Sequence, residues 1–343
     1  MKKVVSFGET LLRLSTPKYQ RLVQSNQLNV SFGGGELNTV IALANYGIPV
    51  DYVTILPQSL IGDWCLSELK KHQVGTHHIL RKEDRMGVYF LETGAVARGS
   101  KVLYDREASA ITHIKLGQID WYAVFEDAQW FHWTGILPAI SLGAAEACLE
   151  AIEVANELGL TVSVDLNYRS TLWNYGMSAR DILPQMLNGC DLILGVLLKD
   201  KEDELKVFQP SKESDNLIDL EAFEQASQEM MQRFSKAKRI VLTIRDSINA
   251  NYNRWSGCMY SDRLYQSKEY NLTHIVDRVG GGDSFFAGLI YGFIKYPGDD
   301  QKALDFAIAS SGIKHTIYGD FNLASLEEIK NVMNGDCLGR PII

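Results

Sequence analysis

The sequence has few cysteines, and their spacing matches neither a zinc site nor a disulfide framework. The 343 residues include five of them, Cys65, Cys148, Cys190, Cys258 and Cys337. No Cys-x-x-Cys pair occurs, so a structural zinc site is not indicated, and an odd, dispersed set argues against a disulfide-rich secreted fold. We expect the cysteines to pack as small apolar side chains in a protein of the reducing cytoplasm.

Long apolar runs and an excess of positive charge are also missing. No run of 18 apolar residues occurs, and the N-terminus passes directly into the short strand-like run Val4–Phe7, so we expect neither a membrane span nor a signal peptide. The chain has 34 Lys and Arg against 42 Asp and Glu, a net charge of −8, which disfavours a nucleic-acid partner. An anionic ligand would need a local positive pocket.

What is present is an alternation of strand-like and helix-like segments. Val4–Phe7 is followed by a helical pattern over Asn38–Tyr46 that ends at Gly47. This order continues with strands expected at Asp51–Ile55, Trp130–Trp133, Thr161–Asp165, Leu192–Leu194 and Ile240–Ile244, and with helices at Gly62–Gln73, Leu142–Leu158, Glu221–Ser235, after Asp283, and at Lys302–Thr316. It predicts one α/β domain over residues 1–343 with a mainly parallel sheet.

Two segments, about 13–32 and 86–110, break the alternation because they lack long helical patterns. The second contains two β runs, Gly87–Glu92 and Ser100–Arg106, separated by a turn near Thr93-Gly94. Strands inserted in such a domain usually form a small separate sheet, and we expect this one to be a lid over the site. Residues 199–217 are charged and irregular and are expected to be a surface loop.

The most informative stretch reads Asp277-Arg278-Val279-Gly280-Gly281-Gly282-Asp283 and leads into an apolar helix. Glycines let the backbone aim successive N–H groups at one point, and a helix N-terminus adds unpaired N–H groups, so the run predicts a phosphate cradle. Asp283 could then accept the proton of a hydroxyl that attacks a phosphoryl group. An aspartate that only caps the helix is the alternative. The run is neither a Walker loop nor a dinucleotide-binding motif.

With these pieces in place, the chain resembles the PfkB (ribokinase-like) family of carbohydrate kinases over nearly its full length. The C-terminal signature of that family, Asp, two residues and Gly-Ala-Gly-Asp, is matched by residues 277–283 with Gly281 in place of alanine. The N-terminal signature is matched by Gly33-Gly34-Gly35-Glu36-Leu37-Asn38 and Leu43-Ala44-Asn45-Tyr46-Gly47. Two signatures in the right order are more specific than either alone.

The resemblance implies a three-layer α/β/α sandwich with a β lid that often mediates dimerisation, ATP and Mg²⁺ as cofactors, and a homo-dimer as the assembly. K⁺ is left open. The nearest likeness is to 2-keto-3-deoxygluconate kinases, whose tyrosines and arginines line a sugar-acid site. The implied substrate-binding residues are Gly34, Asn38, Tyr89, Tyr104, Arg106, Arg169, Asp283 and Asp320. Guanidinium groups bind carboxylates bidentately, and tyrosines offer an apolar face and a hydroxyl. The alternative role of Tyr89 and Tyr104 is packing within the strands, and that of Arg106 and Arg169 is to form surface ion pairs.

In the implied mechanism Asp283 is the general base, and Gly280, Gly281 and Gly282 form the anion hole. Arg169 and Arg106 hold the substrate's carboxylate or an approaching phosphoryl oxygen. The nucleotide would contact these glycines together with Asn167, Thr243, Arg245 and Ser247; at Arg245 the family usually has glycine. Asp277 matches a position that helps to organise a monovalent cation in relatives, and a turn-forming aspartate is the alternative. Mg²⁺ keeps most of its waters, so no direct ligand is assigned.

The match is incomplete in two places. Many relatives carry an Asn-x-x-Glu motif that positions Mg²⁺ through water, whereas residues 196–204 contain no asparagine, and Glu202 or Glu204 is the candidate substitute. An acidic pair that often follows a glycine in relatives is absent after Gly62 as well. These departures leave a weakly active or non-catalytic sugar-acid or nucleotide sensor as an alternative function.

We expect ATP-dependent phosphorylation of the terminal hydroxyl of 2-keto-3-deoxygluconate. A kinase for fructose, ribose or a nucleoside is the alternative within the family. A nicotinamide-dependent oxidoreductase is disfavoured, because Gly8-Glu9-Thr10 after the first strand is followed by no further glycines at the required spacing.

Overall fold

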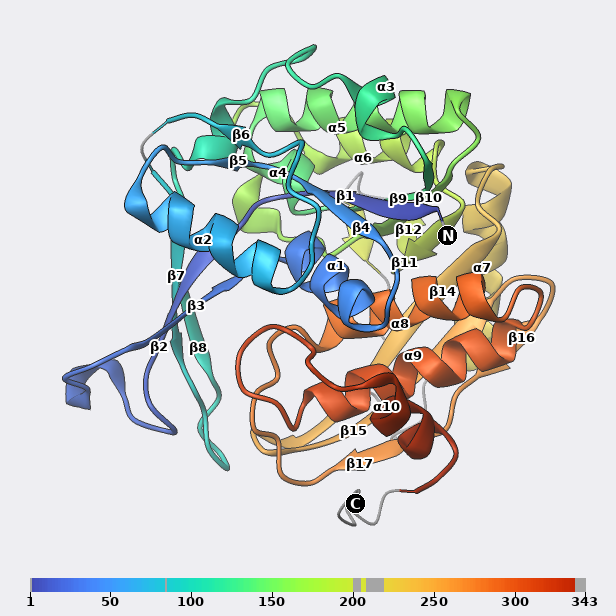
Figure 1. The fold of residues 1–343 in the computed structure, drawn as a ribbon. Coiled ribbons are helices and arrows are strands. Elements are labelled where there is room, and N and C mark those ends of the chain that lie inside the picture. The colour runs from blue at the N-terminus through green and yellow to red at the C-terminus, as the bar shows by residue number, and fades with distance from the viewer. Residues whose placement is uncertain (1, 84, 200–204, 208–218, 337–343) are drawn as a thin grey trace.

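The structure is a computed structural model that describes residues 2–83, 85–199, 205–207 and 219–336. Its centre is a nine-stranded sheet with helices on both faces (Figure 1). Six neighbouring strands are parallel, and their order across the sheet is β4 (Val50–Val53), β1 (Lys3–Phe7), β9 (Ala128–Thr134), β10 (Thr161–Asp165), β11 (Leu192–Leu194) and β14 (Arg239–Asn249). The mainly parallel central sheet that the alternation predicts is confirmed.

Each face of this sheet has its own hydrophobic core because successive strand residues point to opposite sides. In β1, Val5 and Phe7 belong to one core and Val4 belongs to the other. The first core is covered by α3 (Trp121–Val124), α5 (Leu142–Glu157), α6 (Ala179–Leu187) and α7 (Leu220–Arg233). The second is covered by α1 (Gly35–Asn45), α2 (Leu60–Lys71), α8 (Gly281–Lys295), α9 (Asp300–Lys314) and α10 (Leu326–Met333). The predicted three-layer architecture is therefore confirmed.

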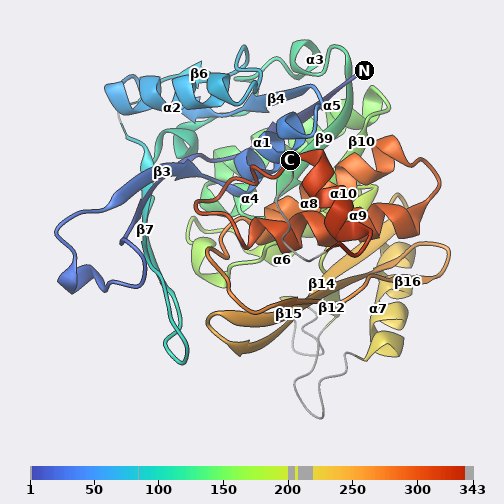
Figure 2. The same ribbon diagram turned by 60° about the horizontal axis from the view of Figure 1, so that its bottom comes forward.

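A small four-stranded sheet projects from one side of this body (Figure 2). Its strands, in order, are β3 (Asn29–Gly33), β2 (Leu11–Ser15), β7 (Gly87–Glu92) and β8 (Lys101–Asp105). The predicted hairpin is β7 with β8, which pair antiparallel, whereas β2 and β7 pair in parallel. The first strand begins at Leu11, two residues before the expected segment, because the buried side chains of Leu11 and Leu12 belong to it.

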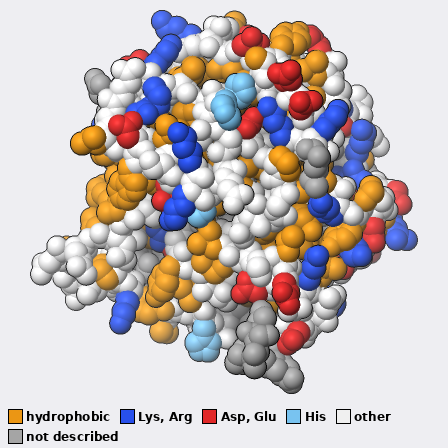
Figure 3. Space-filling view, in the orientation of Figure 1, with side chains coloured by type: hydrophobic (Ala, Val, Ile, Leu, Met, Phe, Trp, Pro, Cys, Tyr) orange, Lys and Arg blue, Asp and Glu red, His pale blue; other side chains and the backbone are white. Residues whose placement is uncertain are grey.

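The rest of the described chain adds shorter elements. The helical ones are α4 (Leu137–Ile140) and the 3-10 turns Leu22–Gln24, Ala110–His113 and Ser170–Leu172. A two-stranded parallel sheet joins β5 (Ile55–Leu56) to β6 (Leu80–Arg81). Within the part described, no helix is long and apolar enough to cross a bilayer. On the face shown in Figure 3, basic and acidic side chains are interspersed.

Three features differ from the sequence-based expectation. β14 runs on to Asn249 and forms a long hairpin with β15 (Tyr252–Tyr260), which pairs with β16 (Leu264–Gln266) and β17 (Tyr270–Leu272). Polar residues interrupt the sequences of β15, β16 and β17, so no apolar run marks these strands. The α6 helix contains Pro184, which weakens its pattern. In the expected loop 199–217, β12 (Leu197–Lys199) pairs with β13 (Leu205–Val207), while 200–204 and 208–217 lie outside the described residues.

Candidate active site

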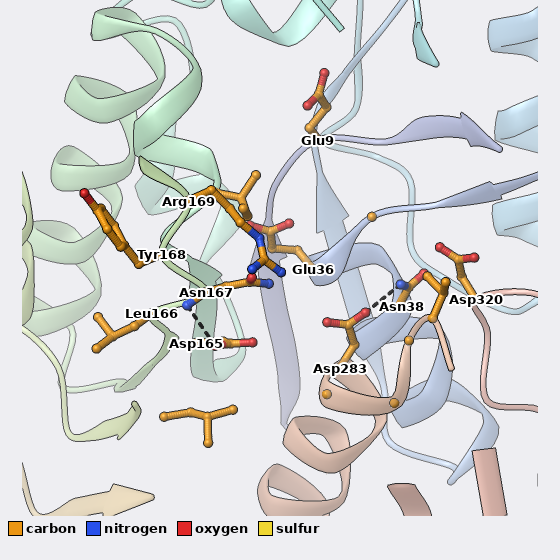
Figure 4. A pocket seen from close by; sticks show the side chains of 18 of the residues that line it. Glu9, Glu36, Asn38, Asp165, Leu166, Asn167, Tyr168, Arg169, Asp283 and Asp320 are labelled. Carbon is orange, nitrogen blue, oxygen red and sulfur yellow. Dashed lines mark hydrogen bonds between the residues drawn. The ribbon is translucent and has the colours of Figure 1, made fainter. Parts of the chain in front are cut away.

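A cavity of about 990 Å³ is lined by residues of the small sheet, of the central sheet and of the start of α8. Its walls include Tyr89 of β7, Asp165 at the end of β10, Thr243 of β14 and Asp283 in the first turn of α8. Figure 4 labels Asp165 and Asp283 among the side chains of this lining. The carboxyl ends of parallel strands are the usual ligand-binding edge of an open α/β sheet, so the position of the cavity follows from the strand order.

Most of the sequence-predicted site residues line this one cavity. They are Gly34, Asn38, Tyr89, Tyr104, Arg106, Asn167, Arg169, Thr243, Arg245, Gly280, Gly281, Gly282, Asp283 and Asp320. Ser247 does not line it, because β14 carries it away from the cavity into the exposed part of the hairpin with β15. Asp277 also lies outside the lining and is buried behind it.

The glycine run opens α8 in the conformation that an anion cradle needs. Gly280 is the N-cap and has a φ of 80°, and a Cβ added there would lie 2.0 Å from the carbonyl oxygen of Asp320. Only glycine fits this position. Around Gly282, in contrast, an added Cβ would meet no atom within 4 Å, so the backbone there faces open space. The positive end of a 15-residue helix therefore opens into the cavity.

Asp283 stands in the first turn of α8 and is held by a residue from α1. The amide nitrogen Nδ2 of Asn38 donates a hydrogen bond to Asp283 Oδ2 over 2.7 Å (Figure 4). Burial raises the pKa of the Asp283 carboxyl well above its usual value, Asn38 lowers it, and the nearby acids Asp165, Asp320 and Glu36 raise it further. The contact that the structure shows for Asn38 thus acts on the proposed base.

Two further carboxyl groups in the cavity wall were missed by the sequence analysis. Asp165 Oδ1 accepts a hydrogen bond from the backbone N–H of Asn167 over 3.0 Å, and burial raises its pKa to about 6. Glu36 Oε1 accepts hydrogen bonds from the hydroxyl of Thr134 over 2.6 Å and from its N–H over 3.1 Å, and burial raises the pKa of Glu36 to about 7. Glu36 is the acid inside the Gly-Gly-Gly-Glu-Leu-Asn motif, which was the available signal.

Three arginines give the cavity a positive wall in a chain of net charge −8. Arg169 follows β10, and its side chain points into the cavity (Figure 4). Arg245 lies over the ring of Trp255, with 5.0 Å from its Cζ to the ring centroid, and Arg278 donates to the carbonyl of Ala250 over 2.7 Å. Burial, with the positive charges of Arg278 and Arg169, lowers the pKa of Arg245 to about 10.

These guanidinium groups are available to an anion. In the part of the chain that the structure describes, none of the three forms an ion pair with a carboxylate. Guanidinium groups that an anionic ligand could engage are therefore present in this cavity, beside the carboxyl groups of Glu9, Glu36, Asp165, Asp283 and Asp320. Arg278 lies inside the Asp277–Asp283 motif but was not singled out from the sequence.

Tyr89 and Tyr104 of the small sheet, and Arg106 directly after it, already contact other protein groups. Tyr89 donates its hydroxyl to the two carboxylate oxygens of Asp320, at 2.7 and 2.8 Å. The rings of Tyr89 and Tyr104 lie 5.8 Å apart. Arg106 lies over the ring of Tyr104 and forms an ion pair with Glu9. Of the arginines assigned to the sugar acid by resemblance, Arg169 is thus the one without a partner carboxylate among the described residues.

The surroundings of Asp277 do not fit a resident K⁺ ion at its carboxylate. Asp277 Oδ2 accepts from Arg13 Nη2 over 2.5 Å and from the N–H of Gly319 over 3.1 Å, and Oδ1 accepts from the N–H of Val279 over 3.1 Å. Lys314 Nζ lies 3.5 Å from its backbone carbonyl oxygen. The oxygen atoms of Asp277 that would bind a cation therefore already contact protein groups.

For Mg²⁺, the fit concerns oxygen donors, which this ion prefers. Asp165 presents a carboxylate to the cavity, and this carboxylate suits the role of a Mg²⁺ ligand, either directly or through a bound water. Among the described residues, no group of three or more His, Cys, Asp or Glu is arranged to hold a metal ion. Glu202 and Glu204, the candidate substitutes for the missing Asn-x-x-Glu motif, lie outside the described residues.

Comparison with known proteins gives a consistent result. Residues 1–241 match the sequence model of the pfkB family of carbohydrate kinases. A 2-dehydro-3-deoxygluconokinase from Thermotoga maritima is 40% identical, covers 98% of this chain and 100% of its own, and superposes with a TM-score of 0.88. A PfkB family carbohydrate kinase from Listeria grayi is 30% identical, and the match covers 97% of this chain and 100% of that one with a TM-score of 0.85. The 2-dehydro-3-deoxygalactonokinase of Haloferax volcanii is 28% identical over 338 residues, 98% of either chain.

Proposed function

This chain belongs to the PfkB family of carbohydrate kinases, and we propose that it transfers a phosphoryl group from ATP to the terminal hydroxyl, O6, of 2-keto-3-deoxygluconate. The product would be 2-keto-3-deoxy-6-phosphogluconate. The observation that carries the proposal is the meeting of three features in one cavity: the carboxylate of Asp283, the open helix end at Gly282, and the arginine wall. The name of the Thermotoga maritima relative supports the choice of sugar acid.

The phosphate groups of ATP fit the N-terminus of α8. The backbone at Gly281 and Gly282 lies beside the positive helix end, where N–H groups stabilise charge that develops on a transferring phosphoryl group. Arg278 directly precedes the glycine run, and its charge acts on Arg245 of β14, so we assign both arginines to the phosphates. Bound Mg²⁺ would neutralise phosphate charge, with Asp165 as the residue placed to hold it.

Asp283 is assigned as the general base for the sugar hydroxyl. Its carboxylate lies in the cavity next to the helix end, so an alcohol bonded to it would face the phosphoryl group bound at Gly282. The raised pKa makes it a stronger base than an ordinary aspartate once it is ionised. The hydrogen bond from Asn38 fixes one carboxylate oxygen and leaves the other for the alcohol.

Arg169 is assigned to the substrate's carboxylate. It comes from the loop after β10, points into the cavity, and has no carboxylate partner in the described part of the chain. A guanidinium can hold a carboxylate bidentately. We assign Tyr89, Tyr104 and Arg106 to the sugar wall, where the Arg106–Glu9 pair offers both a donor and an acceptor to sugar hydroxyls.

A second candidate substrate is the epimer 2-keto-3-deoxygalactonate, because the Haloferax volcanii relative carries that name and aligns over 98% of this chain. The test is a panel of both epimers, gluconate, fructose, ribose and a nucleoside with ATP and Mg²⁺, scored by ADP release. We expect the highest kcat/KM for a 2-keto-3-deoxy acid. Turnover that is fastest with fructose, ribose or a nucleoside, or nucleotide binding without any turnover, would overturn the proposal.

We further propose a cytoplasmic homo-dimer that forms through the small sheet. β8 is an edge strand whose five residues are all exposed, including Val102 and Leu103, and Leu103 is 63% exposed. Hydrophobic side chains also gather at the left of Figure 3. The four described cysteines are free and buried, as suits a reducing compartment. Sedimentation of the wild type and of Leu103→Glu tests the dimer: we expect the variant to be a monomer.

A further inference from the structure

Lys314, the last residue of α9, is a buried lysine that ends between two backbone carbonyls. The residue is 0% exposed. Its Nζ lies 3.2 Å from the carbonyl oxygen of Ile317 and 3.5 Å from that of Asp277. Among the residues that the structure describes, no carboxylate forms an ion pair with it. Backbone carbonyl oxygens are the ligands with which proteins replace the water shell of K⁺.

The charge balance behind the cavity requires this ammonium group. Arg13 joins the carboxylates of Asp277 and Asp320, with 2.5 Å for each contact, and all three residues are buried. Two carboxylates and one guanidinium leave one negative charge, and an unbalanced buried charge is costly. Lys314 adds the missing positive charge, and both carboxylates act to raise its pKa against the lowering effect of burial.

The two carbonyls belong to the two segments that frame the anion cradle. Asp277 starts the run that leads to the glycines, and Ile317 starts the turn that leads to Asp320. These segments touch a second time, since the N–H of Gly319 donates to Asp277, and a third time where Gly280 packs against the carbonyl of Asp320. The ammonium thus joins both segments behind the start of α8.

We propose that the Lys314 ammonium serves as a built-in monovalent cation, which holds the Asp277 and Ile317 carbonyls together so that the enzyme needs no added K⁺. Lys314 is in this view a positioning residue that acts on the phosphate cradle. The proposal rests on the proposed function only in its activity measurement. Its stability measurement requires no substrate.

The test is Lys314→Met, which keeps the apolar stem and leaves the Nζ position empty. Wild type and variant are compared in KCl, NH₄Cl, NaCl and choline chloride at equal ionic strength. We expect wild-type kcat and melting temperature to be the same in K⁺ and choline. The variant should lose at least about 10-fold in kcat in choline, recover most of it in K⁺ or NH₄⁺, and gain several degrees of melting temperature with those ions.

Lys330→Ala, an exposed lysine on α10, is the control and should respond as the wild type does. If the Met variant does not fold, Lys314→Gln replaces it, and the dependence of its melting temperature on the cation decides. The proposal is overturned if wild type is activated several-fold by K⁺ over choline, or if no cation restores the variant's stability. A wild type without activity on the sugar panel would refute the proposed function, while the melting data would still decide this inference.

Discussion

Asn38 donates a hydrogen bond from its side-chain nitrogen to the carboxylate of Asp283 over 2.7 Å, across 245 residues of sequence. The contact joins α1 to the first turn of α8 and therefore links the two signature motifs of the chain. It stabilises the ionised form of Asp283, whose pKa burial raises well above its usual value.

Removing this hydrogen bond should change the pH dependence of catalysis. In Asn38→Ala the pKa of Asp283 rises further, because hydrogen bonds to a charged group are worth about 1.5–3 kcal/mol and one pH unit corresponds to about 1.4 kcal/mol. Since the base must be ionised, we expect the acidic limb of the kcat profile to move about 1–2 units to higher pH. The measurement is kcat from pH 5 to pH 9.

Asp283→Asn is the matched comparison for this profile. It should lower kcat by about 10² to 10⁴-fold at every pH, because no base remains to be ionised. Recovery of the Asn38 variant at high pH, without recovery of the Asp283 variant, separates positioning from catalysis. A wild-type kcat in the Asp283→Asn variant would contradict the proposed mechanism.

The arginines of the cavity should act on different substrates, Arg169 on the sugar acid and Arg245 on ATP. We expect Arg169→Met to raise the KM for the sugar acid by about 10- to 100-fold, the loss of a charge-assisted hydrogen bond, with little change in the KM for ATP. Arg245→Met should do the reverse. Steady-state kinetics with each substrate varied in turn provide the measurement.

Arg263→Met is a control matched to Arg245→Met. Arg263 is exposed and lies over the ring of Tyr265 much as Arg245 lies over that of Trp255. The control should leave both KM values unchanged. Equal effects of the Arg169 and Arg245 variants on both substrates would contradict the assignment.

Two glycines of the cradle should respond differently to alanine. At Gly282 a Cβ meets no atom within 4 Å, so Gly282→Ala should keep the wild-type melting temperature while its methyl group obstructs the phosphate site and lowers kcat/KM for ATP. At Gly280, with a φ of 80° and a carbonyl 2.0 Å from the new Cβ, alanine should lower the melting temperature as well. Calorimetry and kinetics on both variants distinguish the effects.

Glu36 should make the unliganded protein less stable at alkaline pH. Its pKa is raised in the folded state to about 7, so the stability that its protonated form contributes is complete below the unfolded value near 4.5 and is lost as the pH rises through about 7. We expect Glu36→Gln to lose less stability than wild type between pH 5 and pH 8, by up to about 3 kcal/mol. Urea unfolding at both pH values tests this, and identical pH slopes would refute it.

Local patterns were sufficient for much of the fold. Short segments that contain Val, Ile or Leu and are bounded by polar residues predicted β10 and β11 with their observed ends, Thr161–Asp165 and Leu192–Leu194, because strands buried on both faces favour these side chains. The glycine run and the apolar helix after it predicted the glycine-capped start of α8, since both depend only on neighbouring residues. That this helix start binds phosphate stays a prediction. The antiparallel strands β15 to β17 escaped prediction because half-exposed strands lack such a run.

The amino-acid sequence thus indicated most of the residues that reach the cavity, because strand ends, helix starts and glycine turns are local properties. Only the tertiary structure decided which charged side chains have partners. Arg106 meets Glu9, and Arg13 meets Asp277 across 264 residues of sequence. Arg169 forms no ion pair in the described part of the chain, although its charge lowers the pKa of Asp165 against the raising effect of burial. Such pairings depend on sheet register and helix packing, so the arginines of the site that lack an ion pair among the described residues can be identified only after the chain has folded.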